Sequence, residues 1–213
     1  VSDDADFEHT TFHKRALFDS TKFRHADFHE AEFKTTVRFE EAEFVGDADF
    51  QGVETEGEIC FSNSHFSSDA NFENSVFCGE VDFSETQFHD GDTVANEEVN
   101  FKNALFKNKT NFSSVDFPHS NFTASTFQSE AIFNKVIFRN RVLFDRCEFK
   151  GKTIFKEARY ADDADYSDTK FAGEVQFDGA EFRGGNGIDN ESLSLENTHF
   201  EHGAQFRHVQ FQD

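Results

Sequence analysis

Carboxylates at a regular spacing are the first residues of this sequence that could do chemistry. Asp6, Asp27 and Asp49 follow one another at nearly equal intervals. If the chain repeats with that period, these side chains stack roughly 4.8 Å apart and repel one another. A hard cation could relieve the repulsion, but each Asp could instead accept a hydrogen bond from its own turn. The sequence favours the local role, and we expect no metal site.

Nucleophilic and metal-assisted catalysis lack their sequence signatures in this chain. Ser, His and Asp are abundant, yet no GxSxG, HExxH, Walker or GxGxxG motif occurs. Three histidines near the C-terminus are interpreted as surface residues rather than metal ligands: His199, His202 and His208. We therefore expect no enzymatic activity, no catalytic residues and no cofactor.

The cysteines point to a reducing compartment. Cys60, Cys78 and Cys147 are odd in number, far apart and without CxxC spacing, which argues against a disulfide framework or a zinc site. We expect a cytoplasmic location. The alternative is that the chain is an extracellular or cell-surface part of a larger protein.

The aromatic residues reveal the element that must position every other side chain. Between residues 101 and 182 they recur at intervals of 5 or 6, which matches neither a helix nor an ordinary strand. The positions are 101, 106, 112, 117, 122, 127, 133, 138, 144, 149, 155, 160, 166, 171, 177 and 182. All are Phe except Tyr160 and Tyr166. A fixed internal period predicts a repeat architecture.

A small or β-branched residue stands two places before each aromatic centre, as Val99 does before Phe101. Residues two apart share one face of a strand, so both can point inward. A narrow core built from identical layers needs a large ring beside a small side chain. The composition agrees, with 32 Phe and neither Trp nor Met.

These units resemble those of the pentapeptide-repeat family, which read approximately Ala-(Asp/Asn)-(Leu/Phe)-X-X. The best matches are Ala26-Asp27-Phe28, Ala31-Glu32-Phe33, Ala48-Asp49-Phe50, Ala70-Asn71-Phe72 and Ala180-Glu181-Phe182. The resemblance covers nearly the whole chain and implies an all-β fold, a right-handed quadrilateral parallel β-helix or solenoid. The frequent sixth residue predicts a repeat of about nine coils, each of roughly 22 residues. Whether a square section tolerates the extra residue at fixed corners is open at this stage.

One domain, residues 1–213, accommodates the repeat, and we expect it to be part of a longer chain. Two breaks with Gly and acidic residues predict outward bulges near 89–96 and 184–194. Val94 and Ile188 are candidate stand-in centres within these breaks, and Leu195 is a third.

The net charge of −22 is unevenly distributed along the chain. Residues 1–101 carry 25 acidic and 6 basic side chains, residues 102–159 carry 5 and 11, and residues 160–213 carry 12 and 3. Acidity disfavours direct nucleic-acid binding, since phosphates require Lys and Arg. No apolar run approaches the ~20 residues that a membrane helix needs, so we expect no membrane association.

The basic segment contains the candidate interaction patch. Apolar residues there occupy the position just before a centre, which is usually polar and points outward, and bases surround them. The predicted patch is Ile132, Ile137, Arg139, Arg141, Leu143, Arg146, Ile154 and Lys156. Apolar residues rimmed by charge are typical of interfaces. The alternative is that β-propensity fills a tolerant position.

Three interpretations of function follow. The first is a non-enzymatic structural or protein-interaction module, a rigid rod or docking scaffold. The second rests on the resemblance, since some pentapeptide-repeat proteins mimic DNA and bind type II topoisomerases such as gyrase. The third is adaptation of the acidic surface to high salt, which can coexist with the first. The resemblance also implies an end-to-end homodimer through Phe200, Phe206 and Phe211.

Overall fold

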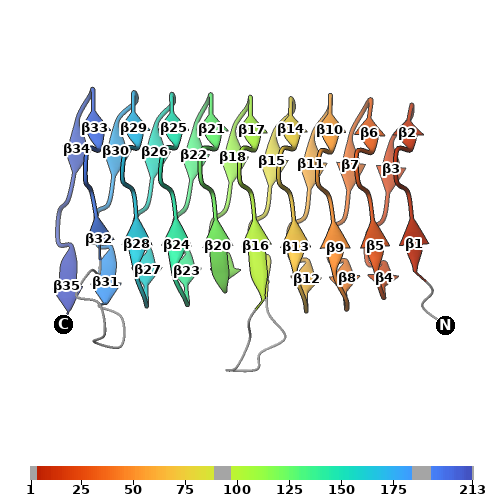
Figure 1. Cartoon of the computed structure of the whole chain (residues 1–213), viewed down its shortest axis with the longest axis horizontal. Helices are drawn as coiled ribbons and strands as arrows, with labels where there is room; N and C mark the ends of the chain where they lie inside the picture. The colour runs from red at the N-terminus through yellow and green to blue at the C-terminus, as the bar shows by residue number, and fades with distance from the viewer. Residues whose placement is uncertain (1–3, 89–96, 184–192, 213) are drawn as a thin grey trace.

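The computed structural model describes residues 4–88, 97–183 and 193–212, and within them every regular element is a short β-strand. The strands lie in parallel rows along a rod whose termini are at opposite ends (Figure 1). No helix in the described part of the chain is long and apolar enough to cross a membrane.

The strands form four faces, numbered here in chain order. Face 1 consists of β1 (Ala5–Asp6), β5 (Ala26–Asp27), β9 (Ala48–Asp49), β13 (Ala70–Asn71), β16 (Glu98–Asn100), β20 (His119–Asn121), β24 (Val142–Leu143), β28 (Ala164–Asp165) and β32 (Leu193–Ser194). Face 2 consists of β2 (Thr11–Phe12), β6 (Glu32–Phe33), β10 (Glu54–Thr55), β14 (Val76–Phe77), β17 (Leu105–Phe106), β21 (Thr126–Phe127), β25 (Glu148–Phe149), β29 (Lys170–Phe171) and β33 (His199–Phe200).

The remaining two faces complete the square. Face 3 consists of β3 (Ala16–Leu17), β7 (Val37–Arg38), β11 (Ile59–Cys60), β15 (Val81–Asp82), β18 (Thr110–Asn111), β22 (Ala131–Ile132), β26 (Thr153–Ile154), β30 (Val175–Gln176) and β34 (Ala204–Gln205). Face 4 consists of β4 (Lys22–Phe23), β8 (Glu43–Phe44), β12 (His65–Phe66), β19 (Asp116–Phe117), β23 (Ile137–Phe138), β27 (Arg159–Tyr160), β31 (Glu181–Arg183) and β35 (Gln210–Gln212). On face 4, isolated bridges from Gln87 to His65 and to Asp116 join β12 to β19.

The register confirms nine coils of close to the predicted length. Ala5 pairs with Ala26 and Ala26 pairs with Ala48, so each partner lies one predicted coil further along the chain. Two offsets are longer, from Ala70 to Val99 and from Ala164 to Leu193. The four-sided parallel β-helix predicted from the sequence is therefore the observed architecture.

The corners explain why the repeat alternates between five and six residues. After every centre on faces 1 and 3, the residue two places on has a positive φ, as in His9 (φ 53°) and Ala124 (φ 58°). At most of these corners the backbone N–H three places on donates to the centre's carbonyl, as Thr10 does to Phe7. A positive φ at the third residue with this hydrogen bond defines a type II turn. The extra residue of the six-residue units lies at every corner from face 2 to face 3, and at several corners from face 4 to face 1. A square section tolerates it because only these corners carry it.

Both long inserts leave the same corner, between faces 4 and 1. Phe88 and Phe101 occupy consecutive faces, as do Phe182 and Leu195. The nine coils therefore need no additional centre between Phe88 and Phe101 or between Phe182 and Leu195. The candidate centres Val94 and Ile188 lie outside the described residues, as do the predicted bulges at 89–96 and 184–192. The second bulge was predicted to extend to residue 194, which is wrong, because residues 193–194 form β32.

The core is four parallel columns of stacked rings, interrupted on face 2 where Thr55 lies between Phe33 and Phe77. Neighbouring rings in one column lie 4.3–5.4 Å apart between centroids, for example 4.9 Å between Phe101 and Phe122. Rings of facing columns meet edge to face, such as Phe112 and Phe122 at an interplanar angle of 82°. Stacked and edge-to-face pairs are the favourable geometries of aromatic side chains. The inward-pointing rings predicted from the spacing are confirmed.

The small residue two places before each centre does more than leave room for the ring. The hydroxyls of Ser75 and Ser125 donate to the carbonyls of Phe50 and Phe101, 2.7 and 2.6 Å away. The Cys147 thiol makes the same contact with the Phe122 carbonyl at 2.9 Å. These buried donors tie one coil to the preceding one, which explains Ser, Thr and Cys at positions that size alone would assign to Ala.

Two buried tyrosines replace Phe in the seventh and eighth coils. Tyr160 on face 4 and Tyr166 on face 1 are fully buried, and their hydroxyls hydrogen-bond to each other at 2.7 Å. Burial raises the pKa of both phenols. Each hydroxyl therefore depends on the other inside a core of hydrocarbon.

A double-mutant cycle tests this pair. We expect Tyr160→Phe to lower the free energy of unfolding by about 1–3 kcal/mol, because it leaves the Tyr166 hydroxyl buried without that partner. The double variant Tyr160→Phe/Tyr166→Phe should recover most of that loss, since both polar groups are gone. Urea unfolding of the four proteins gives the coupling, and simply additive losses would contradict it.

Alkaline pH should destabilise the rod through the same buried groups. Burial raises the pKa of Cys147 and of the two tyrosines above their ordinary values. Their stabilising contribution is complete below the unfolded pKa values, about 8.5 for Cys and 10 for Tyr, and decreases as the pH rises further. We expect a loss of about 1.4 kcal/mol per pH unit per group above those values. Phenolate absorbance that rose before unfolding would contradict this assignment.

Candidate interaction surface

The structure distributes the predicted patch over three faces. Ile132 and Ile154 pair on neighbouring strands of face 3, as their spacing in the sequence predicted. Ile137 lies on face 4 and Leu143 on face 1. All four side chains are half-buried rather than fully exposed. A flat partner cannot contact faces 1 and 3 together, because they are opposite sides of the square.

The bases of the patch already have acidic neighbours. Arg139 forms two hydrogen bonds to Asp116, at 2.7 and 2.6 Å, and these bonds raise the pKa of Arg139. The other pairs are Arg141 with Asp165 (3.7 Å), Arg146 with Asp145 (2.9 Å) and Lys156 with Asp178 (4.0 Å). Exposed ion pairs contribute little to stability, so a partner could exchange them at small cost. The two-bonded Arg139–Asp116 pair is the most fixed of them.

Two shallow grooves meet on face 4 at Ile137. One has a volume of about 560 Å³ and runs past His65, Gln87 and Asp116 to Ile137. The other, about 410 Å³, continues from Ile137 past Arg159 to Glu181. The sequence alone did not identify this surface, because its residues are contributed by every fourth repeat unit. Reading the residue before each centre at intervals of one coil would have found it.

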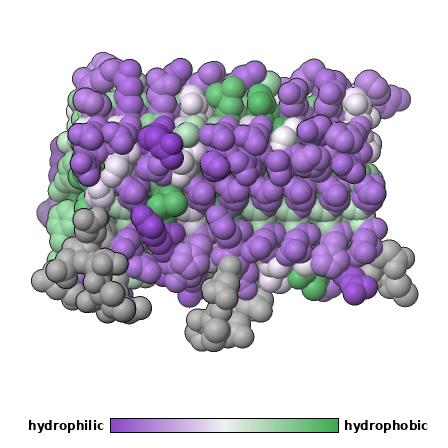
Figure 2. Space-filling model, in the orientation of Figure 1, coloured by the Kyte–Doolittle hydropathy of each residue, from purple (hydrophilic) through white to green (hydrophobic). Residues whose placement is uncertain are grey.

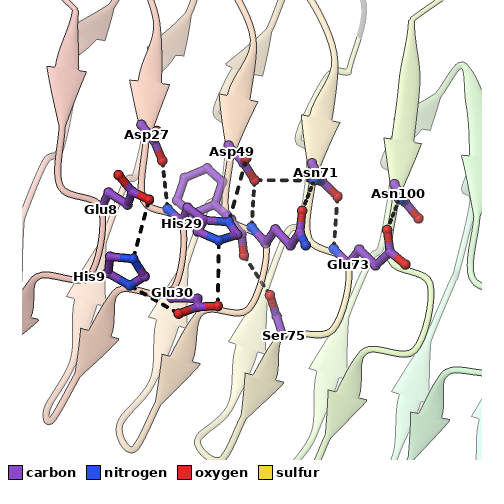
Figure 3. A network of polar contacts seen from close by, with 12 residues as sticks. Glu8, His9, Asp27, His29, Glu30, Asp49, Asn71, Glu73, Ser75 and Asn100 are labelled. Atoms are coloured by element: carbon purple, nitrogen blue, oxygen red, sulfur yellow. Dashed lines mark hydrogen bonds and ion pairs between the residues drawn. The ribbon is translucent and has the colours of Figure 1, made fainter.

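The stacked carboxylates on face 1 accept hydrogen bonds within their own turns. The carboxylates of Asp6, Asp27 and Asp49 accept hydrogen bonds from the backbone N–H two residues on, at 3.1, 2.9 and 2.8 Å. Asn71 makes the same contact further along the column at 3.1 Å (Figure 3). Asn100 makes it with the Lys102 N–H at 3.0 Å. The local role expected for these carboxylates is what the geometry shows. Among the described residues, ligand atoms of Asp6, Glu8 and Asp27 also lie within 4.8 Å of one another.

The remaining predicted positions lie at the surface or near the ends. His199, His202 and His208 are exposed, as expected of surface residues. Of the predicted self-association residues, Phe211 is 63% exposed, Phe206 is 40% exposed and Phe200 is half-buried. The three cysteines are unpaired thiols. Over the described residues, the visible side of the rod is mostly hydrophilic with isolated apolar spots (Figure 2).

Sequence comparison agrees with the geometry. A family model described as pentapeptide repeats (9 copies) matches residues 18–58, 56–94 and 133–181, which is more than half of the chain. The chain belongs to the pentapeptide-repeat family. Its fold is the family's right-handed quadrilateral β-helix, and the protein is a pentapeptide-repeat scaffold. No protein of curated function matches it in sequence.

Two solved pentapeptide-repeat structures are similar in fold. HetL, involved in heterocyst differentiation regulation in the cyanobacterium Nostoc sp. strain PCC 7120, is 11% identical with a TM-score of 0.33. That match covers 91% of this chain and 86% of HetL. A trypsin-treated form of QnrB1, a plasmid-mediated fluoroquinolone resistance protein, is 13% identical with a TM-score of 0.40; the match covers 93% of this chain and 91% of QnrB1. At these identities the likeness concerns the fold alone.

Proposed function

We propose that this pentapeptide-repeat rod is a non-enzymatic protein-interaction module that docks a partner on face 4, around Ile137. The inward positions of every coil are occupied by rings and small residues, so side chains that vary from coil to coil face outward. Binding specificity must therefore reside on the outer faces. The observation that carries the proposal is the meeting of two grooves at a half-buried isoleucine.

The surroundings of Ile137 suit a protein partner. An apolar side chain at the centre with charged residues at the rim is the usual anatomy of an interface. Arg139 and Arg159 flank it, and arginine is enriched at the most energetic positions of interfaces. Of the predicted patch, Ile137 and Arg139 lie on or beside face 4 and would belong to this surface, whereas Arg141 lines a groove on face 1 with Leu143. Ile132, Ile154 and Leu143 lie on other faces and would serve separate contacts.

The test is a photocrosslinking amino acid at position 137, with position 105 as the matched control. Leu105 is a half-buried residue at the equivalent outward position on face 2. We expect a specific protein to be captured from position 137 and not from position 105. Its purified form should bind wild-type chain at least tenfold more tightly than Ile137→Glu, whereas Leu105→Glu should bind normally. Equal binding by the two variants would overturn the proposal.

DNA mimicry toward a type II topoisomerase is the alternative. It is supported by the acidity of residues 1–101, which carry 25 acidic and 6 basic side chains. A triple variant Asp6→Asn/Asp27→Asn/Asp49→Asn removes three charges, and its amides can keep the turn hydrogen bonds that Asn71 makes in the same column. Inhibition or protection of gyrase supercoiling by wild type, weakened in the triple variant, would favour mimicry. No effect at micromolar protein would exclude it.

Self-association through the last coil can accompany either function. Phe206 and Phe211 expose large apolar surfaces there, and burying them against a second copy would be favourable. We expect a concentration-dependent dimer in sedimentation equilibrium that Phe211→Asp weakens. A wild-type chain that is monomeric at 100-fold different concentrations would exclude this contact.

A further inference from the structure

The C-terminal two thirds of face 3 carry nearly balanced charge. Six consecutive strands, from β15 to β34 along the row in Figure 1, each present three outward positions: the second residue of the strand and the residues two places to either side. These positions carry five acidic residues, Glu80, Asp82, Glu130, Glu174 and Asp178, and four basic residues, Lys109, Lys152, Lys156 and Arg207. The whole chain, by contrast, has a net charge of −22. Two copies of an acidic protein repel each other least where their surfaces are close to neutral.

An apolar pair lies at the middle of this segment of face 3. Ile132 and Ile154 pair on the neighbouring strands β22 and β26, with two strands of the segment on either side. Both isoleucine side chains are half-buried. The next outward positions along the column are amides, Asn111 on one side and Gln176 on the other. An apolar centre bordered by polar groups is the usual anatomy of an interface, and the charges around it indicate which molecule would cover it.

We propose that face 3 binds face 3 of a second copy of this chain, with the two rods antiparallel. The two-fold axis lies in the interface, parallel to the strands, and passes between β22 and β26. This axis places β22 opposite β26 of the second copy, β18 opposite β30, and β15 opposite β34. A two-fold dimer requires a surface that is complementary to itself. The contact is separate from the surface around Ile137 on face 4 and goes beyond the function proposed above.

The charges of face 3 are complementary under this symmetry. Glu130 of one copy lies opposite Lys152 of the other, and Lys109 lies opposite Glu174, so the axis generates four pairs of opposite charge. None of the outward positions faces a residue of like charge. Lys152 is exposed, and its ammonium has no acidic partner among the described residues of its own chain. A second copy supplies that partner, and complementary charges across an interface fix its register.

The same charges select the antiparallel orientation. Two parallel rods joined through face 3 would place Lys152 opposite Lys156 and Glu174 opposite Asp178, and such like-charge contacts are unfavourable. The antiparallel contact covers six coils over a width of about five residues, which gives roughly 500 Å² per copy. The total of about 1,000 Å² is near the lower limit for a specific interface. We therefore expect a weak dimer with a micromolar Kd.

Complementary charge reversal, followed by sedimentation equilibrium, tests the proposal. Phe211→Asp is the parent chain, so that association through the last coil does not contribute. We expect Glu130→Lys and Lys152→Glu each to weaken the dimer of the parent at least tenfold, because each places like charges across the axis. An equimolar mixture of the two variants should dimerise about as tightly as the parent, since the reversed charges are again opposite between the two chains.

The matched control makes the same two substitutions on neighbouring strands of face 2. Glu148→Lys and Lys170→Glu should leave the dimer unchanged, alone or mixed, and so should Ile137→Glu on face 4. Equal weakening by the face 2 reversals would mean that net charge rather than face 3 controls association, and would overturn the proposal. A mixture of Glu130→Lys and Lys152→Glu that associates no more tightly than either variant alone would also overturn it, as would a parent chain that stays monomeric well above micromolar concentration.

Discussion

Phe122→Ala is expected to lower the free energy of unfolding by about 3–5 kcal/mol. The ring is fully buried in the middle of the rod. It stacks on Phe101 at 4.9 Å and on Phe144 at 4.8 Å, and it meets Phe112 and Phe133 edge to face. Removing it leaves a cavity that rigid neighbouring coils cannot close, so the cost should lie near the upper end of that range.

The matched control for that change is Phe211→Ala. Phe211 is the face 4 centre of the last coil, but it is 63% exposed and stacks on one side only, against Phe182. We expect its loss to cost less than ~1 kcal/mol because little apolar area leaves the core. Guanidinium unfolding of both variants makes the comparison. Similar losses would mean that the stacked columns do not carry the stability.

Gly79→Ala is expected to cost about 3 kcal/mol, the upper part of the range for forcing extra atoms into a packed region. Gly79 lies at the corner between faces 2 and 3. A Cβ there would lie 2.2 Å from the carbonyl oxygen of Gly57 and 2.3 Å from its carbonyl carbon. Both are backbone atoms of the preceding coil, so the coils themselves would have to separate.

Gly203→Ala is the control for this corner. Gly203 also lies between faces 2 and 3, in the last coil, and a Cβ there would meet nothing within 4 Å. We expect a neutral or slightly stabilising change, because alanine reduces the freedom of the unfolded chain. Thermal unfolding of the two variants decides the point: comparable decreases in Tm would mean that the loss comes from glycine conformation rather than from contact between coils.

The fold could be predicted from the sequence because one inward residue type marks every layer. Phe at intervals of five or six, with a small residue two places earlier, predicted the repeat and its inward rings, and the resemblance to the pentapeptide-repeat family supplied the four faces. The corners were less predictable. The positive-φ position is occupied mostly by His, Ser, Glu and Asn rather than Gly, so no glycine column marked the turns. The sequence did not predict the Tyr160–Tyr166 hydrogen bond, because both tyrosines fall at the same regular spacing as the Phe centres.

The candidate surface was harder to predict because neighbours in sequence are not neighbours in a solenoid. Ile132, Ile137 and Leu143 are close in the chain, yet each successive unit turns onto the next face. Residues that share a face are one coil apart, as Ile137 and Arg159 are.

The corner between faces 4 and 1 has a consequence for engineering this protein. Coils of different lengths all return to the same pairing register. The pairs Ala5–Ala26, Ala26–Ala48 and Ala70–Val99 show this. The length of chain at this edge therefore varies while the stack continues unchanged. Closing a longer loop adds only a small entropic cost, about 0.6 kcal/mol per doubling. Foreign peptides grafted at this edge of an interior coil should therefore be displayed at a position along the rod that the choice of coil determines.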